Sequence, residues 1–245
     1  MNYRTILTIA AMTVMASCNN GNSTKDTSSD SSSQTAESPQ KRSTNIIRRP
    51  ISIPSTFSYI TNIGSVDINF SFGDYSIDVE GDSATLQYLS TDFDSNLLTI
   101  GLLSEDNTDI NKFSNGTKIT MYISAPELQC VSICGTGNFV TEGAWKGDNI
   151  QLGLLGKGTM TFDSIECNSL SLQTTDKGSA IFSSVKADDI TLYTRSNATI
   201  NANIDAQNLT VINDGKPTIT INGRATYYKV KNPNDNNLHL VMVKK

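Results

Sequence analysis

The second half of the chain repeats about every 20 residues. When the segments between residues 128 and 227 are aligned at a turn, five positions become equivalent, at spacings of 21, 20, 20 and 19 residues. These positions are Cys134, Leu155, Thr175, Arg195 and Asp214. A period of this length is typical of a solenoid, in which every repeat adds one coil to a column.

Each repeat has the same internal order of strand, turn, second strand and bend. Apolar residues alternate with polar ones in the first strand, as in Ile150, Leu152 and Leu154, which places the apolar side chains on one face. The turns, such as "CGTGN" and "LGKGT", are rich in glycine. We expect glycine there because a sharp bend demands positive φ.

A single repeat cannot fold alone. It buries about four apolar side chains at roughly 1.5–3 kcal/mol each, whereas ordering about 20 backbone residues costs roughly 1–2 kcal/mol apiece. Stacked coils share a core and hydrogen-bond to the coils above and below. The sequence therefore predicts an all-β protein whose residues 128–227 form a parallel β-helix of about five coils. We expect a right-handed helix, the usual hand of parallel crossovers.

The segment Gly135-Thr136-Gly137 has two interpretations. It could begin a dinucleotide-binding loop, but that loop needs a third glycine where this chain has Val140, and a helix after it. The same Gly-x-Gly also recurs at residues 156–158. A phosphate loop has no reason to recur in every repeat, so we interpret both segments as corners of the solenoid.

Strands without the 20-residue period flank the repeats. Residues 47–127 predict an antiparallel β unit stacked on the first coil, with a hairpin at Gly73-Asp74. Residues 92–96, "DFDSN", resemble the start of a calcium loop but lack its later glycine and glutamate, so they predict a hairpin turn. Residues 104–116 form the longest polar loop, and residues 228–245 predict a hairpin that covers the last coil.

The first residues have the pattern of a secretory signal, with Arg4 followed by a short apolar run. Residues 15–18, "MASC", resemble the lipobox of bacterial lipoproteins, in which cleavage precedes a cysteine that receives acyl chains. We therefore expect residues 1–17 to be removed and Cys18 to anchor the protein in a membrane. Asn19 rather than aspartate favours the outer membrane. The alternative is an ordinary signal with a chance cysteine.

A polar segment follows the proposed anchor. Twelve of residues 19–45 are Ser or Thr, and such a segment cannot bury enough apolar surface to fold. Residues 18–46 are therefore predicted to be a flexible tether. Arg48 and Arg49 could touch anionic head groups or simply end a solvated linker.

Several classes of function find no support in the sequence. The formal net charge is −5 and no basic patch is interleaved with aromatic residues, so nucleic acid is not an expected partner. His239 is the only histidine and is expected to face solvent, so neither a metal site, a cofactor nor a catalytic His pair is predicted. We expect packing residues or free thiols at the three later cysteines: Cys130, Cys134 and Cys167.

The segments "GSVDINFSFGDYSIDVEGD", "LLTI" and "ISAPELQCVSICGTGNF" resemble the putative auto-transporter adhesin head domain, also called the GIN domain. The resemblance covers roughly residues 55–225. It implies a secreted or lipid-anchored bacterial envelope protein with β-solenoid-like repeats and Gly-x-Gly corners. It implies no catalytic or ligand-binding residue.

Three functions remain open at this stage. The first is a lipid-anchored, non-catalytic protein for adhesion or envelope binding, whose ligand would be a glycan or a host or envelope protein. The second is a polysaccharide-cleaving β-helix enzyme, with candidate carboxylates near the second bend: Asp163, Glu166, Asp188, Asp189 and Asp205. The third is a structural spacer. Trp145 is either a core residue or, with Tyr193 and Tyr227, part of a sugar-binding platform.

Overall fold

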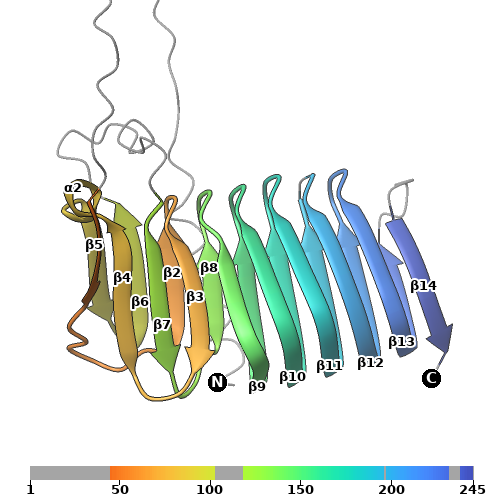
Figure 1. The fold of residues 1–245 in the computed structure, drawn as a ribbon. Helices are drawn as coiled ribbons and strands as arrows, with labels where there is room; N and C mark the ends of the chain where they lie inside the picture. The colour runs from red at the N-terminus through yellow and green to blue at the C-terminus, as the bar shows by residue number, and fades with distance from the viewer. Residues whose placement is uncertain (1–44, 103–117, 196, 232–237, 245) are drawn as a thin grey trace, which may run out of the picture.

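The computed structural model describes residues 45–102, 118–195, 197–231 and 238–244. Their strands stack side by side into one elongated column (Figure 1). The predicted signal, Cys18, nearly all of the predicted tether and the loop of residues 104–116 lie outside the described residues.

The predicted solenoid is confirmed, with about five turns. Long strands that bend in the middle form its coils: β9 (Phe139–Leu154), β10 (Thr159–Thr174), β11 (Ser179–Thr194), β12 (Thr199–Asn213) and β13 (Thr218–Lys231). Neighbouring coils pair in parallel, and Leu170 of β10 lies opposite Ile150 and Ile190. The sequence period is therefore the spatial period of the column.

Apolar side chains form continuous columns inside the coils. The alternation that the sequence shows places Leu152, Leu172 and Leu192 in register, and each is no more than 2% exposed. On the opposite side of the core, Phe162 stacks on Phe182 with ring centroids 5.0 Å apart. Each coil thus depends on its neighbours for burial, which is the expected property of a solenoid.

The corner glycines are required for a reason other than the predicted one. Among the described glycines, positive φ occurs only at Gly64, Gly143 and Gly223, none of them in a Gly-x-Gly corner. At Gly156 a Cβ atom would instead lie 2.0 Å from the carbonyl oxygen of Gly135 in the preceding coil. The corners therefore need glycine because successive backbones stack closely.

The N-terminal strands extend the same column. They are β1 (Ile46–Pro50), β2 (Tyr59–Ile63), β3 (Asp67–Phe72), β4 (Ser76–Asp82), β5 (Leu89–Asp94), β6 (Leu97–Leu102), β7 (Thr120–Ala125) and β8 (Cys130–Ile133), with one short helix, α2 (Ser83–Leu86). The parallel pairs are β2 with β6 and β8, β3 with β7 and β9, and β8 with β9. The predicted antiparallel arrangement holds only for β1–β4, β4–β7 and β5–β6.

Two N-terminal predictions about turns have opposite outcomes. The predicted hairpin at Gly73-Asp74 is wrong, because β7 lies between β3 and β4. The turn signal reverses the chain but does not decide which strands pair. The hairpin turn at residues 92–96 is confirmed, since β5 and β6 pair antiparallel around Ser95 and Asn96, whose φ values are 50° and 72°.

The predicted C-terminal hairpin is also wrong. Strand β14 (Leu238–Lys244) pairs in parallel with the first half of β13, and Leu238 lies opposite Ile219. Its apolar residues alternate in the register of the repeat, so β14 begins a further coil and covers Ile219 and Ile221.

Arg48 and Arg49 lie in β1 rather than at the end of a linker. The guanidinium of Arg48 pairs with Asp78 at 3.0 Å and lies 4.1 Å from the ring centroid of Tyr122. Arg48 is therefore engaged within the sheet, whose first described strand begins at Ile46.

Candidate functional site

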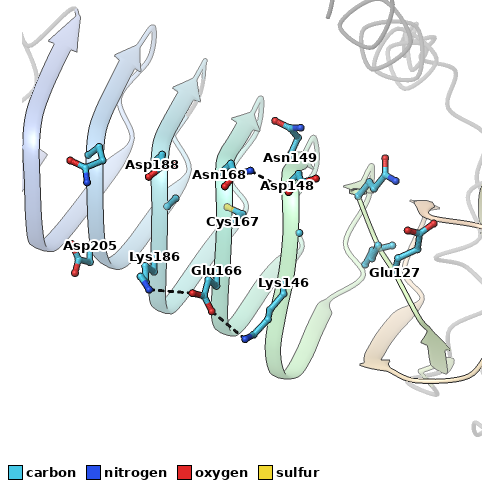
Figure 2. A pocket seen from close by; sticks show the side chains of 15 residues that line it. Glu127, Lys146, Asp148, Asn149, Glu166, Cys167, Asn168, Lys186, Asp188 and Asp205 are labelled. Atoms are coloured by element: carbon cyan, nitrogen blue, oxygen red, sulfur yellow. Dashed lines mark hydrogen bonds and ion pairs between the residues drawn. The ribbon is translucent and has the colours of Figure 1, made fainter. Parts of the chain in front are cut away.

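Each coil has a short third side between its two long arms, and this side carries a groove. The groove has a volume of about 780 Å³, crosses the bends of β9, β10, β11 and β12, and extends to residues 127–129 (Figure 2). We call it the side groove. It lies where the second bend of every repeat was predicted.

Charged residues of alternating sign form one row along the side groove. They occupy one position in successive coils: Lys146, Glu166, Lys186 and Asp205 line the groove, and Arg224 continues the row beyond its lining. Glu166 pairs with Lys146 at 3.3 Å and with Lys186 at 3.2 Å, as Figure 2 shows. Hydrogen bonds from Lys186 and Lys146 lower the pKa of Glu166 below its ordinary value. This carboxylate is therefore ionised at neutral pH and is poorly suited to act as a general acid.

A second row consists of carboxylates and amides two residues further along each coil: Asp148, Asn168, Asp188 and Gln207. The amide nitrogen of Asn168 donates to Asp148 at 3.2 Å, so part of this row is held by its own hydrogen bonds. Asn149 lies beside the row and also lines the groove. The two rows face solvent with Cys167 between them (Figure 2).

Small residues lie between the two rows. Register places Gly147, Cys167, Ala187 and Ala206 at one position of successive coils. Ala187 and Ala206 are buried, whereas the Cys167 thiol is partly exposed. Burial, with a smaller contribution from the Asp188 charge, raises the pKa of Cys167 to about 11. Cys167 is therefore a neutral thiol at physiological pH and a weak nucleophile.

The structure brings together some of the carboxylates that the sequence singled out. Glu166, Asp188 and Asp205 line the side groove, but Asp163 lies outside its lining. Asp189 follows the second row and accepts a hydrogen bond from Asn208 at 2.8 Å. These carboxylates lie along one groove because the same bend positions recur in every coil.

Trp145 belongs to the core. Its side chain is fully buried, its Nε1 donates to the Leu128 carbonyl oxygen at 2.9 Å, and its ring packs against Phe72 and Phe162. The sugar-platform interpretation is therefore wrong for Trp145. Tyr227, in contrast, is 70% exposed.

The histidine and the cysteines show no arrangement for catalysis in the described part of the chain. His239 is exposed on β14, as predicted. Cys130 and Cys167 are free thiols, as expected. Burial raises the pKa of Cys130 to about 11. Within the described part of the chain, no group of His, Cys, Asp and Glu residues is arranged to hold a metal ion, and no helix is long and apolar enough to cross a membrane.

Sequence reasoning missed the side groove itself. The signal was present, because reading one position per repeat gives the alternating charges of Lys146, Glu166, Lys186 and Asp205. That signal emerges only when the outward-facing positions of the third side are known.

Comparison with solved structures shows the fold. A putative adhesin from Bacteroides fragilis has a TM-score of 0.62, is 16% identical, and the match covers 82% of this chain and 97% of that one. A putative adhesin from Parabacteroides merdae has a TM-score of 0.52 at 16% identity, and the match covers 81% of this chain and 96% of that one. A putative lipid binding protein from Parabacteroides distasonis has a TM-score of 0.54 at 16% identity, with 82% and 95% covered.

Comparison with protein families identifies the group to which the chain belongs. None of the curated proteins matches it. One family model matches residues 56–184, more than half of the chain, and this range contains β3, β7 and the first Gly-x-Gly corners. The chain therefore belongs to the family described as putative auto-transporter adhesin, head GIN domain.

Proposed function

We propose that this protein is a lipid-anchored bacterial surface protein whose solenoid head binds a component of another surface or of the envelope. The family and the β-solenoid fold support a non-catalytic, adhesin-like surface protein. Membership in the family is the observation that carries the proposal. The stacked coils supply a rigid body on which binding groups keep fixed positions.

The anchor part of the proposal depends on Cys18. The lipobox-like residues 15–18 precede a long Ser/Thr-rich segment, which would hold the head at a distance from the membrane. Several acyl chains would make the attachment stable, because each buried methylene contributes about 0.8 kcal/mol.

The anchor is tested by growing cells with radiolabelled palmitate and comparing the full chain with Cys18→Ser. The wild-type chain should carry label and sediment with outer membranes, and the variant should be unlabelled and released. Protease added to intact cells then reports which way the head faces. Equal labelling of the two chains would contradict the anchor.

The binding part is tested on intact cells that express the wild-type chain, the Cys18→Ser variant or no chain. Wild-type cells should adhere to surfaces coated with glycans or matrix proteins, and the other two should adhere less. Equal adhesion of all three, with a weakened envelope only in cells without the chain, would instead favour a structural spacer.

Polysaccharide cleavage is the second candidate, because the side groove gathers Glu166, Asp188 and Asp205. Glu166 is held ionised by two lysines, which argues against a role as general acid. The test is the release of reducing or unsaturated ends from polysaccharides. Turnover that Asp188→Asn abolishes would contradict a purely binding function.

A further inference from the structure

We propose that the side groove is a binding site for an extended, uncharged glycan chain that lies along the column axis. This inference rests on the proposed function and names the ligand class and the site. It is carried by the shape of the groove, the polarity and charge of its lining, and the exposure of two of its polar side chains.

The shape fits a linear ligand. The groove crosses β9, β10, β11 and β12, so each coil contributes polar side chains to its two rows. Neighbouring parallel strands lie about 4.8 Å apart, so a polar group recurs in each row at that interval, with its chemical kind alternating from coil to coil. This interval is close to the length of one pyranose unit in an extended glycan, so each successive sugar would face one coil.

The lining favours a hydrophilic ligand. Amide and carboxylate groups both accept hydrogen bonds, and amides also donate, which suits the hydroxyl groups of sugars. Among the lining residues the only large aliphatic side chain is Leu128, which is 2% exposed. Pockets for lipids and drug-like molecules are lined mainly by apolar side chains, so such ligands fit this groove poorly.

The charge of the groove excludes polyanions. Five carboxylates line it (Glu127, Asp148, Glu166, Asp188 and Asp205) against two ammonium groups (Lys146 and Lys186). Arg224, which lies next to the lining, pairs with Asp205. The remaining excess of negative charge repels nucleic acid and acidic polysaccharides. An uncharged glycan would not meet that repulsion.

The backbone argues against an extended peptide. A peptide that binds by strand addition needs a free sheet edge. Along the side groove, β10 pairs with β9 and β11, and β12 pairs with β11 and β13. The groove therefore offers side chains rather than unpaired backbone groups.

Two lining residues can bind a ligand without the loss of a hydrogen bond within the rows. Within the described part of the chain, the side chains of Asn149 and Asp188 have no hydrogen-bonding side-chain partner, and both are exposed. Figure 2 shows them on the bends of β9 and β11. Their neighbour Asn168 is held by Asp148, so the surrounding wall is organised before a ligand binds.

The test is calorimetric titration of the full chain carrying Cys18→Ser. The probes are linear hexamers of β-1,4-linked glucose, mannose and N-acetylglucosamine, the corresponding dimers, an oligogalacturonate and an oligolysine peptide. At least one neutral hexamer should bind, and its dimer should bind more weakly because it spans fewer coils. Oligogalacturonate should not bind.

Asn149→Ala combined with Asp188→Ala should weaken hexamer binding by roughly tenfold or more, the effect of losing one or two hydrogen bonds. The matched control combines Asp163→Ala with Ser171→Ala, which lie outside the groove lining, and should bind as the parent does. Thermal unfolding of all three chains verifies that they fold equally.

The inference is overturned if no neutral hexamer binds, if only oligolysine binds, or if both double variants weaken binding equally. If no hexamer binds but cell adhesion still depends on the chain, the groove site is rejected and the proposed function is retained. Hexamer binding by a chain that does not affect adhesion would reject the adhesive function and support the groove site.

Discussion

Gly156→Ala tests whether the corners need glycine because successive coils stack closely. The added Cβ atom would lie 2.0 Å from the carbonyl oxygen of Gly135 and 2.7 Å from its carbonyl carbon. Both contacts are far shorter than van der Waals contact, and the obstructing atoms belong to backbone. The two corners must therefore move apart by about an ångström.

The movement threatens specific hydrogen bonds. The Gly135 carbonyl accepts from the backbone nitrogens of Lys157 at 2.8 Å and of Gly158 at 3.1 Å. Losing two such bonds costs roughly 1–3 kcal/mol, and the residual overlap adds about 1–2 kcal/mol of strain. We expect Gly156→Ala to lower the free energy of unfolding by about 2–5 kcal/mol, which corresponds to roughly 4–20 °C in Tm for a domain of this size.

The assay is urea-induced unfolding followed by circular dichroism, with amide hydrogen exchange to locate the change at residues 155–158. Gly147→Ala is the matched control, because the nearest atom to its Cβ would be Ile150 Cγ1 at 3.5 Å, an ordinary contact, and its φ is not positive. The control should change stability by less than about 0.5 kcal/mol. Equal effects of the two substitutions would refute the stacking argument.

Three further predictions concern Trp145 and the two free thiols. Trp145→Phe should lower the free energy of urea-induced unfolding by about 1–3 kcal/mol, because the Leu128 carbonyl loses its hydrogen-bond partner. Trp145→Ala should lower it by about 3–5 kcal/mol. An unchanged unfolding midpoint for both variants would contradict the burial of Trp145. The rate at which iodoacetamide alkylates Cys167 should rise with pH towards about 11, and Asp188→Asn should increase that rate. A half-maximal rate near pH 9 would contradict the effect of burial on this thiol. Burial raises the pKa of Cys130 from 9.0 to about 11, so the unfolded chain releases this proton at a lower pH than the folded chain does. Stability should therefore fall as pH rises from 9 to 11. Cys130→Ala should reduce that fall in melting curves recorded over this pH range.

The repeat could be predicted from the sequence because it is encoded locally. Alternation at Ile150, Leu152 and Leu154 places side chains on one face without reference to any other segment. The recurrence of that pattern about 20 residues later then implies stacking. The corner glycines were found by the same reasoning, although their physical role was not, because the close approach of Gly135 and Gly156 is a property of two stacked coils.

The candidate site was only partly predictable. The sequence singled out Glu166, Asp188 and Asp205 as recurrent bend residues, and the structure places all three along the side groove. It left Trp145 undecided between core and surface, because a bend residue has no alternation to show which way it points. The buried hydrogen bond from Trp145 to Leu128 decides for the core.

Tertiary structure alone decided the order of strands at the N-terminal end and the course of the C-terminal strand. Strand β7 separates β3 from β4, and β14 joins β13 in parallel rather than folding back as a hairpin. A turn signal specifies that the chain reverses, whereas the choice of partner depends on which distant strand offers a matching apolar column and free backbone groups. The sequence by itself therefore determined the coil, its period and its inward face, since these follow from neighbouring residues. The pairing partners and the groove depended on contacts between segments far apart in the chain.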